Sequence, residues 1–214
     1  MYDYVLFDLD GTLTNPELGI TNCVMYALEK FGIKVDSRKK LHPFIGPPIK
    51  HSFQYFYGFS EEESTLAVAY FRERFSQIGW RENEIFEGIA EVLQELKKRN
   101  KKIILASCKL EEYSIRILKH FQIEQYFDFI AGSTMDGRRS EKEDVIAYAL
   151  EQCKIQDKSK VIMVGDRKYD IVGANINGID SMGVLFGFGD YEELKAAKAT
   201  IIVKEVEEIL RYIR

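Results

Sequence analysis

The sequence predicts an α/β protein with a doubly wound parallel sheet and a small all-helical domain inserted after the first strand. Three observations lead to this prediction. The chain opens with a short apolar run at Val5–Phe7, residues 15–83 show helical periodicity only, and from residue 85 short apolar segments alternate with amphipathic ones. Apolar strands that alternate with amphipathic helices are typical of a parallel sheet covered on both faces.

The segment after Thr14 is expected to be helical. Apolar residues recur at helical spacing up to Gly32, Pro48 is suited to open a second helix, and Ser60 with Glu63 forms a capping box that introduces a third. We therefore expect an all-helical cap domain at residues 15–84 and an α/β core at residues 1–14 and 85–214. Polar residues at both crossings, 15–16 and 82–84, are suited to act as hinges.

The core continues the alternation to the end of the chain. We expect strands at residues 103–106, 127–131, 161–164, 181–186 and 200–203. We expect helices at residues 89–100, 111–120, 141–153, 171–177, 191–197 and 205–212. In such a Rossmann-like arrangement, a functional site lies beyond the carboxyl ends of the strands.

The composition limits the class of protein. The 214 residues are 46% hydrophobic and carry a net charge of -4, with acidic and basic residues spread along the chain. Because there is no basic stripe or tail, we expect neither a nucleic-acid polymer nor a membrane as a partner. The three cysteines form no Cys-x-x-Cys pair, which argues against a disulfide framework or a zinc site. With no leader-like start and no apolar run of membrane-spanning length, we expect a soluble cytoplasmic protein.

The first strand runs into two carboxylates. Asp8 and Asp10 follow the apolar run, and Gly11 permits a sharp turn directly after them. Both side chains can then point into one small volume, where two carboxylates repel each other unless a cation lies between them. Hard oxygen ligands of this kind suit Mg²⁺. Alone, the motif also fits a strand that ends in an ordinary turn.

Two further strand ends carry groups that could bind an anion. Ser107, with the backbone N–H groups around Cys108 and Lys109, could hold a phosphate oxygen, although a structural serine in a turn is an open alternative. Lys142 lies in Ser140–Glu143, which has the pattern of a capping box. A lysine in the first helical turn opposes the helix dipole, so either a nearby anion or simple solvent exposure would explain it.

A second pair of carboxylates follows the strand at residues 161–164. Asp166 and Asp170 are four residues apart, and they can reach one centre if a helical turn begins one or two residues after Asp166. Helix capping could explain Asp166 alone. It would not explain why a second acidic pair matches the pair formed by Asp8 and Asp10.

These motifs resemble those of the aspartate-nucleophile phosphohydrolases of the haloacid dehalogenase superfamily. They occur in the order that this superfamily has, which here is Asp8 with Asp10, Ser107, Lys142, and Asp166 with Asp170. A helical cap after the first strand is also found there, so that the resemblance covers essentially the whole chain. Three segments look most similar to a bacterial branch labelled phosphoglycolate phosphatase or 5′-nucleotidase, namely residues 165–170, 44–48 and 136–138.

The resemblance implies a Mg²⁺-dependent phosphomonoester hydrolase that works through an aspartyl phosphate. Asp8 would attack phosphorus, Asp10 would act as acid and base, and Ser107 and Lys142 would bind phosphate oxygens. The implied magnesium ligands are Asp8, the main-chain carbonyl of Asp10, Asp166 and Asp170. The partner would be a small phosphate ester, with phosphoglycolate, a nucleoside monophosphate, a sugar phosphate and pyrophosphate all open, and the protein would be a monomer or a homodimer.

Further candidates for substrate contact have weaker support. They are Thr12, Gly46, Lys50, Cys108 and Lys109, together with Ser107, and Arg72 on the long helix of the cap. The chain also departs from the superfamily pattern, because Lys142 does not precede the usual proline and Cys108 replaces a small polar residue. Lys109 is therefore the alternative to Lys142 as the lysine that neutralises the phosphate.

Two other functions stay open. A phosphomutase on the same scaffold would need the same motifs and would pass the phosphoryl group to a sugar hydroxyl instead of water. A catalytically inactive binding or regulatory module is the alternative from another class. A dehalogenase is disfavoured, because Asp10 supplies an acid and base that such enzymes lack.

Overall fold

The computed structural model describes residues 1–137 and 139–214 and consists of two compact units. One unit comprises Met1–Thr14 and Ile85–Arg214, and the other comprises Asn15–Glu84. The segments in which the chain crosses between units, β2 (Thr14–Asn15) and β3 (Glu84–Ile85), pair as a two-stranded sheet. The sequence did not reveal these strands, because two residues are too few to show an alternating pattern. Of the segment 136–138, Arg138 lies outside the described residues.

A six-stranded parallel sheet forms the centre of the first unit. Its strands are β1 (Tyr4–Phe7), β4 (Lys102–Leu110), β5 (Phe129–Ser133), β6 (Val161–Gly165), β7 (Asp180–Val184) and β8 (Ile201–Val203). Their order is β5-β4-β1-β6-β7-β8, and every pairing is parallel. The prediction of a doubly wound α/β fold is confirmed. Because β1 lies between β4 and β6, the direction of winding changes at β1, and its carboxyl end is the expected place for a site.

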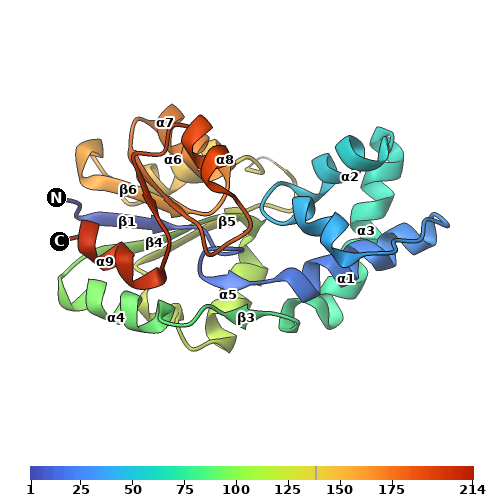
Figure 1. The fold of residues 1–214 in the computed structure, drawn as a ribbon, viewed down its shortest axis with the longest axis horizontal. Coiled ribbons are helices and arrows are strands. Elements are labelled where there is room, and N and C mark those ends of the chain that lie inside the picture. The colour runs from blue at the N-terminus through green and yellow to red at the C-terminus, as the bar shows by residue number, and fades with distance from the viewer. Residues whose placement is uncertain (138) are drawn as a thin grey trace. The chain divides into compact units, whose positions relative to one another are not determined.

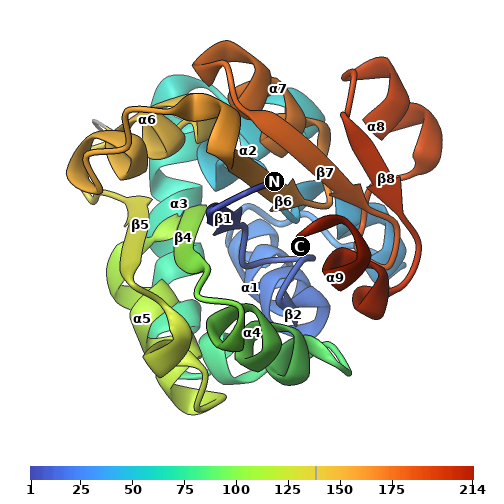
Figure 2. The same ribbon diagram turned by 90° about the vertical axis from the view of Figure 1, so that its left-hand side faces the viewer.

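Helices cover both faces of this sheet, as Figure 2 shows, with α6 and α7 on one face and α4, α5 and α9 on the other. Their bounds are α4 (Ile89–Lys98), α5 (Glu111–His120), α6 (Lys142–Gln152), α7 (Lys168–Asn177), α8 (Tyr191–Ala196) and α9 (Ile209–Tyr212), with 3₁₀ turns at Glu124–Tyr126, Lys158–Lys160 and Val206–Glu208. Leu6, Ile104 and Met163 lie in register on adjacent strands and pack with Val145 and Ala149 of α6. Among the described residues, no helix combines the length and hydrophobicity that crossing a membrane requires.

Strand β4 is longer than the sequence suggested. Its predicted end was Ala106, but the strand continues to Leu110, with an irregularity in its pairing to β5 between these two residues. The extra residues of a bulge bend a strand and redirect its side chains, and bulges are frequent beside active sites. Ser107, Cys108 and Lys109 therefore lie in an irregular strand end rather than in a strand-to-helix turn, which was the alternative for Ser107.

The predicted capping box at Ser140–Glu143 is wrong. Helix α6 begins at Lys142, its N-cap residue is Glu141, and the Glu141 side chain makes no capping hydrogen bond. The Ser140 hydroxyl instead lies 3.3 Å from the carboxylate of Glu141. Lys142 is nevertheless in the first helical turn, as predicted.

The second unit is helical and is drawn in blue to cyan in Figure 1. It contains α1 (Glu17–Lys30), α2 (Ile49–Tyr57) and α3 (Glu61–Gln77), with 3₁₀ segments at Arg38–Phe44 and Gly79–Arg81. The predicted capping box of α3 is confirmed, because Ser60 Oγ accepts from the Glu63 N–H at 3.1 Å and the Glu63 carboxylate accepts from the Ser60 N–H at 2.9 Å. Phe53 is fully buried and packs against Phe44 and Phe59.

We expect Ser60→Ala to lower the free energy of unfolding by about 1 kcal/mol, because the α3 N-terminus loses its cap. Thr65→Ala is the matched control on the same helix. The Thr65 hydroxyl donates back to the Glu61 carbonyl within the helix, so its removal should be close to neutral. Urea denaturation followed by circular dichroism measures both, and equal losses would contradict the role of the cap.

Candidate active site

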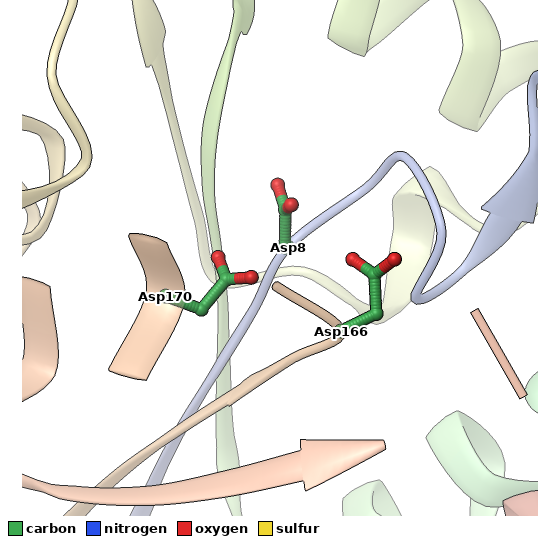
Figure 3. Close-up of side chains that lie close together, drawn as sticks. All are labelled: Asp8, Asp166 and Asp170. Carbon is green, nitrogen blue, oxygen red and sulfur yellow. The ribbon is translucent and has the colours of Figure 1, made fainter. Parts of the chain in front are cut away.

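Three carboxylates meet beyond the carboxyl ends of β1 and β6. Asp8 directly follows β1, Asp166 directly follows β6, and Asp170 lies in the first turn of α7. The register of the strands causes this meeting, since Phe7 pairs with Val164 and the Asp8 N–H donates to the Val164 carbonyl at 2.9 Å. One oxygen from each carboxylate lies within 4.8 Å of the others. Figure 3 shows the three side chains around a common space, with Asp8 from the N-terminal segment and Asp166 and Asp170 from the segment that runs from β6 into α7.

Glycines allow backbone to pack directly against these carboxylates. A Cβ atom at Gly11 would lie 2.1 Å from Asp166 Oδ2, and one at Gly165 would lie 2.1 Å from Asp170 Cγ. A Cβ atom at Gly187, in the loop after β7, would lie 2.4 Å from Asp166 Cβ. Gly11 also has a φ of 87°, so the sharp turn expected after Asp10 is present.

The two carboxylate oxygens of Asp166 have different surroundings. Its Oδ2 accepts a hydrogen bond from the Phe188 N–H at 2.8 Å. Its Oδ1 is buried and has no hydrogen-bond partner among the residues that the structure describes. Such an oxygen is costly to bury, and a divalent cation would satisfy it. The oxygen donors of Asp8, Asp166 and Asp170 therefore fit Mg²⁺.

Lys142 is the buried cation of the cluster. Its Nζ lies 2.8 Å from Asp8 Oδ1 and 2.8 Å from Asp170 Oδ1, and it donates to the Ala106 carbonyl at 3.0 Å. Its side chain is only 3% exposed, so the alternative of a solvated surface lysine is wrong. The helix dipole opposes a lysine at this position, and the two carboxylates compensate for it.

Lys109 pairs with the other aspartate of the first motif. Its Nζ lies 2.7 Å from Asp10 Oδ2, and both side chains are about a tenth exposed or less. The two candidate lysines thus have different partners, with Lys142 at Asp8 and Lys109 at Asp10. Thr12 is fully buried, and its hydroxyl has no hydrogen-bond partner within the described chain.

Ser107 and Cys108 lie in the irregular end of β4. The buried Ser107 hydroxyl accepts from the Lys109 N–H at 3.3 Å, which leaves its own proton to donate. Burial raises the pKa of the Cys108 thiol to about 12. The thiol is therefore protonated at neutral pH, and Cys108 can act as a small contact residue but not as a nucleophile.

Burial dominates the ionisation of the acidic groups. It raises the pKa of Asp170 to about 6 although Lys142 acts in the opposite direction. Burial, with Asp170 and Asp8 nearby, raises the pKa of Asp166 well above its usual range, and burial also raises the pKa of Asp10. Burial opposes the charge of Lys142, but Asp170 and Asp8 together raise its pKa, so it stays protonated. Without a bound metal these carboxyl groups therefore tend to hold protons, which a cation could replace.

The candidates in the second unit lie on or beside α2 and α3. Gly46 lies between Arg38–Phe44 and α2 with a φ of 105°. Lys50, on α2, forms an ion pair with Glu61 at the start of α3. Arg72 is half-buried on α3. A substrate contact by any of these residues stays a prediction.

Sequence reasoning missed the loop that follows β7. Phe188 donates its N–H to Asp166, and Gly187 and Gly189 let the loop approach, since a Cβ atom at Gly189 would lie 1.9 Å from the Asp166 carbonyl oxygen. The sequence did contain a signal for this loop, because Gly187 and Gly189 flank Phe188 directly after the strand predicted at residues 181–186. Their target could not be read from the sequence, because it lies in another loop.

Comparison with known proteins gives the family of this chain. Residues 5–184 match the family described as haloacid dehalogenase-like hydrolase. The chain belongs to this family. The resemblance inferred from the motifs is thereby confirmed.

Several relatives of this hydrolase have names that refer to phosphoryl chemistry. A 5′-nucleotidase of Pseudomonas aeruginosa is 40% identical over 199 residues, which cover 93% of this chain and 90% of that protein. The tyrosine-protein kinase PtkA of Mycobacterium tuberculosis is 37% identical over 198 residues, which cover 92% of this chain and 67% of the kinase. A crystal structure described as a "predicted phosphatase" from Clostridium acetobutylicum has a TM-score of 0.97 and 47% identity, and the match covers 100% of this chain and 98% of that chain.

We expect Gly187→Ala to weaken Mg²⁺ binding to this hydrolase by roughly tenfold, because the new methyl group would push the loop and its Phe188 N–H away from Asp166. Gly178→Ala is the control, since Gly178 ends α7 with a φ of 70° and has open space around it. This control should lose stability without losing affinity. Calorimetric titration of the metal-free proteins with MgCl₂ measures the affinity. Unchanged binding by Gly187→Ala would refute the assignment of Asp166, held by the Phe188 N–H, as a ligand of the metal.

We also expect the metal-free protein to become less stable as the pH rises from about 4 to above 6. The folded pKa of Asp170 is about 6, above its ordinary value of 3.8, so the folded state binds the proton more tightly than the unfolded chain does. The resulting stability is fully present below the unfolded pKa and is lost as the pH rises through the folded pKa, at roughly 1.4 kcal/mol for each pH unit between the two pKa values. Urea unfolding in EDTA measures this, and Asp170→Asn should reduce the slope, while the raised pKa values of Asp166 and Asp10 leave part of it. An identical slope in the variant would contradict the assignment to Asp170.

Proposed function

We propose that this protein is a Mg²⁺-dependent phosphomonoester hydrolase that acts on a small phosphorylated metabolite through an aspartyl phosphate. The observation that supports it best is the buried cluster of Asp8, Asp166 and Asp170 with Lys142 paired to Asp8. A carboxylate of this kind can attack phosphorus while nearby cations reduce the repulsion between the carboxylate and the negatively charged phosphate group. The family of the chain and the names of its relatives support the same reaction class.

In the first step an Asp8 oxygen attacks phosphorus in line, and the bond from phosphorus to the leaving oxygen breaks. Mg²⁺, when held by Asp8, Asp166, Asp170 and the main-chain carbonyl of Asp10, supplies positive charge beside the transferring group. Lys142 and the Ser107 hydroxyl bind the equatorial oxygens. This electrostatic contribution is where most of the rate gain in phosphoryl transfer arises.

Asp10 moves the protons in both steps. It gives its proton to the leaving oxygen, and the leaving group departs as an alcohol. It then takes a proton from the water that attacks the aspartyl phosphate, which releases inorganic phosphate and restores Asp8. The raised pKa of Asp10 favours the protonated form that the first step needs, and the ion pair with Lys109 favours the charged form that the second step needs.

For the substrate, we propose a phosphoglycolate-like or 5′-nucleotide-like monoester. The 40% identity to a protein named 5′-nucleotidase supports the second of these. We further propose that the helical unit acts as a cap, with Gly46 and Lys50 in substrate contact, and that Thr12, Ser107, Cys108 and Lys109 contribute from the core. The remaining proposals are a cytoplasmic monomer or homodimer with no nucleic-acid polymer or membrane as partner.

We expect Asp8→Asn to abolish turnover while the protein stays folded, because the amide is not a nucleophile but has nearly the same shape. Phosphate release from p-nitrophenyl phosphate with Mg²⁺ in excess tests this, with circular dichroism as the check on folding. EDTA should also abolish turnover of the native protein. Full activity in Asp8→Asn, or activity independent of Mg²⁺, would end the proposal.

A substrate panel then separates the alternatives through kcat/KM. It includes phosphoglycolate, nucleoside monophosphates, sugar phosphates and pyrophosphate. A requirement for a sugar bisphosphate activator would favour a phosphomutase. Transfer from ATP to tyrosine in a peptide would favour the activity after which one relative is named. No phosphoryl transfer on the whole panel would favour an inactive binding module.

A further inference from the structure

Helix α6 holds Lys142 in place without a cap of its own. Lys142 is its first residue, the N-cap residue Glu141 makes no capping bond, and the Ser140 hydroxyl is turned to Glu141. An uncapped N-terminus is prone to fray. A lysine side chain also has a flexible four-carbon stem. Contacts other than a side-chain cap must therefore hold the first turn of α6, from which Lys142 reaches Asp8.

Arg139, three residues before Lys142, is bound on three sides. Its Nε donates to the Gly132 carbonyl at the end of β5 at 2.7 Å. Its Nη2 donates to the carboxylate of Glu111, the first residue of α5, at 3.0 Å. Its guanidinium carbon lies 3.7 Å from the centre of the Tyr148 ring on α6. We call these four residues the Arg139 clamp.

The clamp fixes the end of β5 tightly. Besides the bond from Arg139 to its carbonyl, Gly132 donates its own N–H to Glu111 Oε2 at 3.2 Å. A Cβ atom at Gly132 would lie 2.4 Å from Glu111 Cα, so the start of α5 is packed directly on the backbone of β5. The planar guanidinium group of Arg139 donates its hydrogen bonds in fixed directions, so the contact between the end of β5 and the start of α5 has a defined geometry.

The clamp joins the two sides of the Lys142 contact. On one side, β4 supplies the Ala106 carbonyl that accepts from Lys142 and continues directly into α5 at Glu111. On the other side, Tyr148 belongs to the same helix as Lys142. Arg139 bridges Glu111 and Tyr148, and therefore ties the donor helix to the acceptor strand at a second point.

We propose that Arg139 is a positioning residue for Lys142: it holds the start of α6 so that the lysine ammonium stays between Asp8 and Asp170. This inference rests on the proposed function, since it assigns Arg139 to the same reaction without contact with the reacting atoms. A displacement of about 1 Å at a catalytic group can cost a large factor in rate. The alternative is that α7 holds the start of α6, since the Asn177 amide donates to the Glu143 carbonyl at 3.0 Å.

A double-mutant cycle tests the proposal. Arg139→Ala should lower kcat for p-nitrophenyl phosphate roughly tenfold with a smaller change in KM. Arg139→Lys should restore little of this activity, because an ammonium group cannot make the two guanidinium hydrogen bonds and also stack on the Tyr148 ring. In the Lys142→Ala background, Arg139→Ala should lower kcat less than about twofold, because its effect passes through the lysine. If turnover of Lys142→Ala is below detection, the cycle is measured as calorimetric binding of inorganic phosphate with Mg²⁺ present.

Arg99→Ala is the matched control for a lost arginine. Arg99 is also half-buried and bound at several points, to Glu95 and to the carbonyls of Leu210 and Ile213, but these contacts lie on α4 and at the end of the chain. Arg99→Ala should lower the melting temperature and leave kcat per folded molecule unchanged. A loss of kcat in this control equal to that of Arg139→Ala would mean that general destabilisation explains the effect, and would overturn the proposal.

The other outcomes are equally decisive. Native kcat in Arg139→Ala would show that α7 suffices to hold Lys142, and would overturn the positioning role. Equal losses in the two backgrounds would show that Arg139 acts independently of Lys142, and would also overturn it. Absence of Mg²⁺-dependent turnover and of phosphate binding in the native protein would instead refute the proposed function, which keeps the two failures distinguishable.

Discussion

The structure depends on the compensation of buried negative charge. Asp8, Asp166 and Asp170 are almost fully removed from water, and the described part of the chain provides one lysine, Lys142, in contact with two of them. Burial of unbalanced charge costs several kcal/mol for each ion, and such groups commonly take up a proton or a cation instead. A folded chain keeps this arrangement only if the surrounding structure stabilises it and if a ligand compensates for the remaining charge.

The sheet provides the surrounding structure. Reversal of the winding direction at β1 leaves a space beyond its carboxyl end, and the strand pairing brings the ends of β1 and β6 to the same level, with Ala106 of β4 beside them. Backbone closes this space because Gly11, Gly165 and Gly187 have no Cβ atoms. Polar backbone atoms, such as the Phe188 N–H and the Ala106 carbonyl, then fix the side chains. The site is thus built mostly by main chain, and only a few side chains carry the chemistry.

Relatives with similar identity to this chain have names for different reactions, a 5′-nucleotidase at 40% and a tyrosine-protein kinase at 37%. A core that activates a phosphoryl group does not by itself choose the group that is transferred or the acceptor. We therefore attribute the phosphoryl chemistry to the first unit. In the proposed function Asp10, with its partner Lys109, carries the proton transfer, and Gly46 and Lys50 of the second unit stay candidates for substrate contact.

The sequence alone determined the fold class and the identity of the chemical groups. Apolar runs and turn residues are local signals, so the sheet, the order of its elements, and the acidic pairs at Asp8 and Asp166 could be read from neighbours in the chain. The tertiary structure decided which groups meet. Lys142 could not be separated from Lys109, and the roles of Arg139 and Phe188 were not visible, because each depends on a contact with a segment distant in sequence. The capping box at Ser140 failed for a related reason: its local pattern was satisfied, but the Ser140 hydroxyl lies beside the Glu141 carboxylate, and the neighbouring Arg139 bonds to segments distant in sequence.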